Sequence, residues 1–106
     1  MDKEIDFIVK QYKERLKALG IKVKKIILYG SHAQGMAKED SDIDLVVISN
    51  DFKDMDLWER LSLLGRARMG IRKPMEILGL TEEELAQEGE GTFIGDEVKA
   101  KGMEML

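Results

Sequence analysis

Residues 30–35 read Gly-Ser-His-Ala-Gln-Gly, and residues 41–45 read Ser-Asp-Ile-Asp-Leu. These two pieces decide the fold, because a short β-rich run ends at the first piece and an almost wholly apolar run begins in the second. We therefore expect strands at residues 25–29 and 43–48, and the apolar character of the second predicts a place inside a sheet. The connection starts with Gly30, which permits a backbone turn that a side chain would obstruct.

The turn after the first strand has the features of a phosphate-binding site. Ser31 is a good helix N-cap, so we expect about one turn of helix to begin there and to end at Gly35. The N–H groups at the start of such a turn are free to bind phosphate, and the helix dipole favours an anion there. Gly30 and Ser31 are therefore candidate nucleotide-binding residues.

Two carboxylates lie at the start of the second strand. Asp42 and Asp44 are separated by one residue, so on a strand their side chains share a face. Mg²⁺ binds through one or two carboxylates and fills its other positions with water and substrate phosphate oxygens. Paired like charges are also costly without a cation. The pair predicts a magnesium site, and the alternative for Asp42 is that it only caps the strand.

A third acidic residue, Glu76, interrupts the apolar run of residues 75–80, which predicts a third strand. A charged residue there must face water, pair with a cation such as Lys73, or bind a metal. Together with Asp42 and Asp44, it would complete a site able to hold two Mg²⁺ ions for in-line phosphoryl or nucleotidyl displacement. Glu76 is thus a candidate metal ligand and catalytic residue, with a simple ion pair as the open alternative.

The rest of the chain is expected to supply helices around these strands. Apolar residues three or four apart predict an amphipathic helix over residues 3–19, ended by Gly20. Capping-box patterns, in which Asp or Thr is followed three residues later by Glu, predict helices that begin after Asp56 and after Thr81. A last helix is expected near residues 97–101. This order of elements predicts an α/β or α+β fold, with helices packed against a small sheet.

Several side chains outside the site are assigned to the core or the surface by their spacing. His32, the only histidine, is expected at the surface or stacked on a nucleotide. The methionines are expected to be core filler: Met75, Met103 and Met105 are three of them. The second helix carries four apolar residues at helical spacing that we expect to be core residues: Leu57, Trp58, Leu61 and Leu64.

The composition bounds the class of protein. The 106 residues suit one domain over residues 1–106, and 17 Lys and Arg against 21 Asp and Glu give a net charge of −4. This acidity argues against extensive nucleic-acid binding. The absence of cysteine excludes a disulfide framework and a Cys nucleophile, and it suits a cytoplasmic protein. The apolar runs are too short to span a membrane, and the start of the sequence has no signal-peptide pattern.

Gly-Ser, followed ten residues later by Asp-x-Asp, resembles the signature of the nucleotidyltransferase superfamily that includes DNA polymerase beta. In this sequence the signature is Gly30-Ser31 with Asp42-Ile43-Asp44. The short chain and the order of its elements are similar to the minimal nucleotidyltransferases (the MNT group), over about residues 3–80. Members are commonly paired with a HEPN protein in bacterial and archaeal toxin–antitoxin modules.

The resemblance implies a small mixed sheet with helices packed against it and a Mg²⁺-dependent activity. Members transfer a nucleotide, usually AMP from ATP, to an acceptor and release pyrophosphate. In the paired systems the acceptor is the HEPN toxin, typically at a tyrosine hydroxyl, and the modification silences it. A chain of this length leaves much of the acceptor site to the acceptor itself or to a partner.

Carried over by position, Gly30 and Ser31 match the family's phosphate-binding turn. Asp42 and Asp44 match its two metal-binding carboxylates. Glu76 falls near the third carboxylate, which is more often Asp and would act as general base on the acceptor hydroxyl.

The sequence departs from the family pattern at His32 and Gln34, where many members carry Arg or Lys. Other cations could grip the triphosphate instead: Lys38, Arg66, Arg68, Arg72 and Lys73. These departures leave a second function open, an antitoxin-like binding module that neutralises its partner by contact. Nucleotide transfer to a small molecule ranks last, because such enzymes usually carry a further helical domain. An exposed edge of the sheet could also pair two copies into a homodimer.

Overall fold

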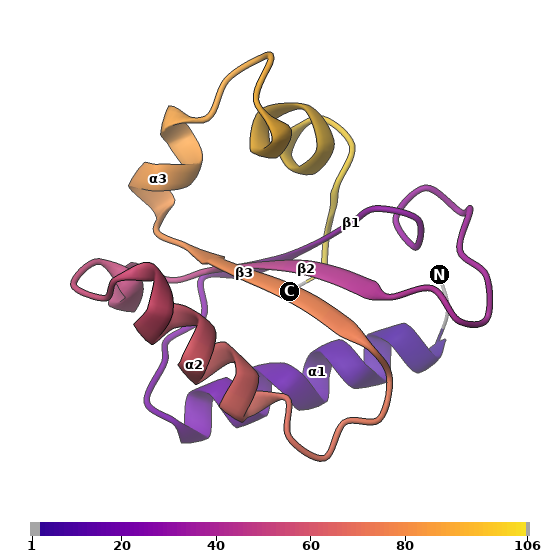
Figure 1. The fold of residues 1–106 in the computed structure, drawn as a ribbon, viewed down its shortest axis with the longest axis horizontal. Coiled ribbons are helices and arrows are strands. Elements are labelled where there is room, and N and C mark those ends of the chain that lie inside the picture. The colour runs from indigo at the N-terminus through magenta and orange to yellow at the C-terminus, as the bar shows by residue number, and fades with distance from the viewer. Residues whose placement is uncertain (1–2, 106) are drawn as a thin grey trace.

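A computed structural model describes residues 3–105 of the chain (Figure 1). The elements are, in order, α1 (Lys3–Ala18), β1 (Lys25–Tyr29), β2 (Ile43–Ile48), the 3-10 turn η1 (Asn50–Phe52), α2 (Leu57–Ala67), β3 (Met75–Leu80), α3 (Glu82–Gln87), the π-helical segment η2 (Ile94–Lys99) and β4 (Met103–Glu104). The three predicted strands are confirmed, and so are the helices predicted from Asp56 and Thr81, whose capping boxes both form. The helix predicted near residues 97–101 is confirmed in part, because a helical segment covers residues 97–99, but η2 begins three residues earlier and is π-helical.

The four strands form one mixed sheet in the order β3-β2-β1-β4. β1 is antiparallel to β2 and to β4, whereas β2 and β3 are parallel. A parallel pair needs a long crossover connection, which α2 supplies. β2 lies inside the sheet, as its apolar sequence predicts. The register places Tyr29 opposite Asp44 and Asp44 opposite Glu76, so these three residues form one row across the sheet.

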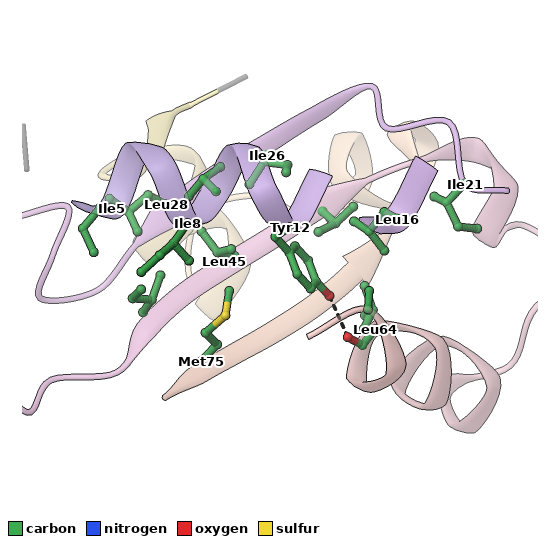
Figure 2. Close-up of a cluster of buried hydrophobic side chains, with 14 of the residues drawn as sticks. Ile5, Ile8, Tyr12, Leu16, Ile21, Ile26, Leu28, Leu45, Leu64 and Met75 are labelled. Carbon is green, nitrogen blue, oxygen red and sulfur yellow. Dashed lines mark hydrogen bonds between the residues drawn. The ribbon is translucent and has the colours of Figure 1, made fainter. Parts of the chain in front are cut away.

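One face of the sheet is covered by α1 and α2, and the other by α3 and η2 (Figure 1). The predicted stripe of α1 is confirmed as core, since its apolar side chains are buried: Ile5, Ile8, Val9, Tyr12 and Leu16. Figure 2 shows Ile5, Ile8, Tyr12 and Leu16 on the side of α1 that faces the sheet. The Tyr12 hydroxyl donates a hydrogen bond of 2.8 Å to the carbonyl of Leu64 and so ties α1 to α2. This is the larger of the two apolar clusters.

The prediction of four core residues on α2 is largely wrong. Leu64 is buried, but Trp58 is 76% exposed, Leu57 69% and Leu61 41%. α2 packs mainly on β3, which is the edge strand, so the outer side of the helix has no sheet beneath it. Helical spacing predicts a helix, but it does not say how far the sheet extends under that helix.

The prediction that the methionines are core filler is also only partly confirmed. Met75 at the start of β3 is buried, as expected of core filler. Met103 lies on the edge strand β4 and is 39% exposed, so it is not core filler. Met105 is partly buried against the larger cluster.

Arg60 is a structural centre that the sequence did not single out. Its guanidinium donates hydrogen bonds to the carbonyls of Phe52 (2.7 Å), Met55 (3.1 Å) and Gly79 (3.1 Å). It also binds both carboxylate oxygens of Glu84, at 2.6 and 3.0 Å. One side chain therefore joins η1, α2, β3 and α3, and it occupies the Gly79 carbonyl on the edge strand.

Candidate functional site

The row of Tyr29, Asp44 and Glu76 lies on the face of the sheet that α3 and η2 cover. Side chains alternate along a strand, so Asp44 shares its face with Val46, which packs in the cluster under η2. Burial decreases along the row: Tyr29 is buried, Asp44 is half-buried and Glu76 is exposed. The row therefore opens to solvent at the β3 side, while its Tyr29 end is packed into the fold.

Asp44 and Glu76 are close enough to affect one another's ionisation. Burial, together with the negative charge and hydrogen bonding of Glu76, raises the pKa of Asp44 to about 6. The charge of Asp42 acts in the same direction, whereas His32 opposes it. Burial, Asp44 and Glu76 together raise the pKa of Tyr29 to about 12. These like charges favour a bound cation.

Gly30 follows β1 directly and packs on the Asp44 carboxylate. Its φ is +73°, a conformation that L side chains rarely adopt. A Cβ built on Gly30 would lie 2.3 Å from Oδ2 of Asp44. The turn therefore needs glycine for two independent reasons, which confirms the expectation that a side chain would obstruct it.

The segment after Gly30 is a hydrogen-bonded turn, not the short helix that the sequence predicted. The N–H groups of Ala33 and Gln34 donate to the Gly30 carbonyl at 3.1 and 3.2 Å, and Gly35 ends the turn with a φ of +70°. Within residues 3–105, the N–H groups of Ser31 and His32 have no hydrogen-bond partner. They are thus free donors at the position where the sequence places a phosphate.

His32 closes the loop that joins the turn to β2. Its Nε2 lies 3.2 Å from the Ser41 carbonyl oxygen, and the Ser41 hydroxyl accepts a 2.8 Å hydrogen bond from the N–H of Lys38. The loop is therefore held at both ends, close to the carboxylates. The expectation of a surface position is only partly right, because His32 is half-buried.

Asp42 lies just outside β2, which begins at Ile43, and its side chain is exposed. The shared face of Asp42 and Asp44 therefore stays a prediction, and the charge of Asp42 does reach Asp44. Within the described part of the chain, no three His, Asp or Glu side chains form a group that could hold one metal ion. The carboxylates that the fold brings together are Asp44 and Glu76.

This donor set fits Mg²⁺ better than it fits a metal held wholly by protein ligands. Mg²⁺ takes one or two carboxylates and completes its octahedron with water and phosphate oxygens. Asp44 and Glu76 supply carboxylates on an open side of the fold, and the free N–H groups of Ser31 and His32 lie nearby on the turn.

A hollow of about 620 Å³ lies beside the turn, and two of the predicted cations line it, Lys38 and Lys73. His32 and Glu39 also contribute to its wall. Lys73 pairs with Glu4 at 3.7 Å and donates to the Glu39 carbonyl at 3.2 Å. The suggested ion pair between Lys73 and Glu76 is thus not formed within residues 3–105. The three arginines named as candidate cations do not line this hollow.

The fold and the turn-and-carboxylate arrangement define a class of protein. The sequence matches the nucleotidyltransferase domain family over residues 9–98, so the chain belongs to this family.

Individual relatives agree with that assignment. A protein of Methanocaldococcus jannaschii, provisionally named a protein adenylyltransferase, is 48% identical over 44 residues, which are 42% of this chain. The match spans about half (50%) of that relative's length.

Solved structures share the fold. A protein of Sulfolobus solfataricus, provisionally named a nucleotidyltransferase, superposes with a TM-score of 0.69 at 20% identity, over 95% of this chain and 78% of that one. A toxin–antitoxin structure with AMP-PNP gives 0.65 at 22% identity, over 92% and 71% of the two chains. A mutant MntA-HpeT toxin–antitoxin gives 0.58 at 19% identity, over 93% and 69%. At these identities the likeness shows the fold.

Proposed function

We propose that the protein is a Mg²⁺-dependent nucleotidyltransferase that moves AMP from ATP to a hydroxyl group of a second protein. The proposed acceptor is a HEPN-type toxin partner. The observation that carries the proposal is the packing of Gly30 on Asp44, which puts free N–H donors beside a carboxylate pair at one end of the sheet. The relative named for protein adenylyltransfer and the toxin–antitoxin fold neighbours support the choice of acceptor.

Each residue of the site has a role in the proposed reaction. The N–H groups of Ser31 and His32 bind the phosphates, with Gly30 giving them close access to the backbone. Asp44, Glu76 and the exposed Asp42 are the proposed Mg²⁺ ligands. As predicted from the sequence, these three carboxylates would hold two ions. Bound Mg²⁺ neutralises charge on the phosphate oxygens and so makes the α-phosphorus easier to attack.

The covalent step is an in-line displacement at the α-phosphorus. The acceptor oxygen forms a bond to this phosphorus while the bond to the bridging oxygen of pyrophosphate breaks. Glu76 is the proposed base that takes the proton of the acceptor hydroxyl, since it is the exposed end of the row. Pyrophosphate leaves with the electron pair of the broken bond.

A partner could instead be neutralised by contact alone. The exposed apolar side chains of Leu57, Trp58 and Leu61 on α2 favour this second candidate, because they present apolar surface that the fold leaves uncovered. This binding-module function needs neither ATP nor Mg²⁺.

The pairing of two copies through a sheet edge also stays a prediction, and Arg60 already occupies part of the β3 edge.

The deciding experiment incubates the protein with α-labelled ATP and Mg²⁺ in a lysate of its source organism. Asp44→Asn is the test variant, and Asp54→Asn is the matched control, because Asp54 is an exposed carboxylate between η1 and α2, after the end of β2 that is opposite to the site. We expect a labelled acceptor band with the unmodified protein and with Asp54→Asn, and none with Asp44→Asn. Normal labelling by Asp44→Asn would refute enzymatic transfer. A partner retained equally by all three proteins without any label would favour the binding module.

A further inference from the structure

Phe93 presents an aromatic ring next to the proposed site. It lies directly before η2, and its side chain is 56% exposed. Its ring packs edge-to-face on Tyr29, with centroids 5.7 Å apart and planes at 82°. Tyr29 ends β1 opposite Asp44, and the charges of Asp44 and Glu76 act on its hydroxyl. Phe93 is therefore separated from the carboxylates by a single side chain.

The segment that carries Phe93 is tightly closed. Thr92 donates to the Gly89 carbonyl through its hydroxyl (2.9 Å), and the same hydroxyl accepts from the N–H of Gly95 (2.9 Å). The Asp96 carboxylate accepts from the N–H of Gly91 (3.1 Å). A Cβ on Gly95 would lie 1.9 Å from the Gly89 carbonyl oxygen, so the two backbones are in direct contact. The ring is thus held in place by its backbone although more than half of it faces solvent.

We propose that Phe93, positioned by Tyr29, is the surface on which the base of the bound nucleotide stacks; this inference rests on the function proposed above. Phosphates bound by the turn and carboxylates leave the nucleoside to extend along the same face of the sheet. The exposed ring of Phe93 lies on that face, where η2 begins. Every base has a π-face, so stacking holds the nucleotide with little choice between ATP and GTP.

The test separates the base from the phosphates. Binding of α,β-methylene ATP and of inorganic tripolyphosphate is measured by calorimetry with Mg²⁺, for the full chain and for Phe93→Ala, Phe93→Trp and Phe7→Ala. Phe7 is the matched control, because it is 67% exposed on α1, which covers the opposite face. Circular dichroism and thermal unfolding establish that each variant is folded.

We expect Phe93→Ala to weaken binding of the ATP analogue by about tenfold or more, to leave tripolyphosphate binding unchanged, and Phe93→Trp to retain binding. Phe7→Ala should bind both probes normally. Unchanged affinity of Phe93→Ala for the analogue, or equal loss for both probes, would overturn the inference while leaving nucleotide transfer standing. Failure of the unmodified protein to bind either probe would overturn the proposed function and this inference with it.

Discussion

The two faces of the sheet are covered unequally. Under α1 and α2 the cover is continuous and apolar, and its buried polar link is the hydrogen bond from Tyr12 to Leu64. Under α3 and η2 a smaller cluster covers only part of the face, and the row ending in Asp44 and Glu76 lies at its margin. The difference indicates that the face under α1 and α2 mainly stabilises the fold. The face under α3 and η2 buries fewer apolar side chains and carries the carboxylates of Asp44 and Glu76.

The largest expected effect tests the open face. Asp44→Asn should lower nucleotide transfer by about a thousandfold, which corresponds to about 4 kcal/mol. The same change should not destabilise the fold, because burial and like charges already raise the pKa of Asp44 and so disfavour its charged form in the folded state. Transfer rate per folded molecule and urea unfolding measure the two effects. A strongly destabilised variant would show that this carboxylate serves the fold.

A pair of leucines compares the two faces directly. Leu16→Ala removes a fully buried side chain from the first face and should lower the free energy of unfolding by about 3 kcal/mol. Leu85→Ala removes a partly buried side chain from the second face and should cost about 1 kcal/mol. Urea unfolding of both variants gives the values. Equal losses would break the distinction between a stabilising face and an open one.

Arg60 joins α2, on one face of the sheet, to α3, on the other, so removing its guanidinium should weaken the packing on both faces. Arg60→Met keeps much of the side-chain volume but leaves the Glu84 carboxylate and three carbonyls without their donor. We expect a loss of about 2 kcal/mol in unfolding free energy. Arg66→Met, on an exposed position of the same helix, is the control and should change stability by less than about 0.5 kcal/mol. Similar values for the two variants would contradict the linking role.

Much of the fold could be predicted because its signals are local. The strand bounds follow from short apolar runs, one of which ends at Gly30 and another of which begins after Pro74. The starts of α2 and α3 follow from capping boxes that form as expected. The burial of α2 could not be predicted in this way, since Trp58 is exposed only because β3 is the edge of the sheet. Strand order is a non-local property that helical spacing does not encode.

The site shows the same division between local and non-local information. The turn at Gly30 could be predicted, because its positive φ is a local requirement, whereas the close approach of Asp44 to Gly30 could not. The closeness of Asp44 to Glu76 depends on the parallel register of β2 and β3, which no spacing along the chain reveals. Arg60 was missed for a similar reason, since its partners lie on three other elements and one loop. Phe93 meets Tyr29 across more than sixty residues of chain.

The smallest expected effect concerns the charge that fastens α3 over the second face. Hydrogen bonds from Arg60 lower the pKa of Glu84 in the folded protein. As the pH falls, Glu84 is therefore protonated in the unfolded chain before it is protonated in the folded one. The contribution of Glu84 to stability is therefore present above its ordinary pKa and is lost as the pH falls through its lower, folded-state pKa. Because the side chain is 39% exposed, Glu84→Gln should cost less than about 1 kcal/mol at neutral pH. Urea unfolding at neutral pH and at about pH 3 should show that the difference in unfolding free energy between Glu84→Gln and the unmodified protein closes in acid. The control Glu83→Gln, at an exposed position, should show no such gap at either pH. A gap that persists in acid would mean that Glu84 acts through its shape and not through its charge.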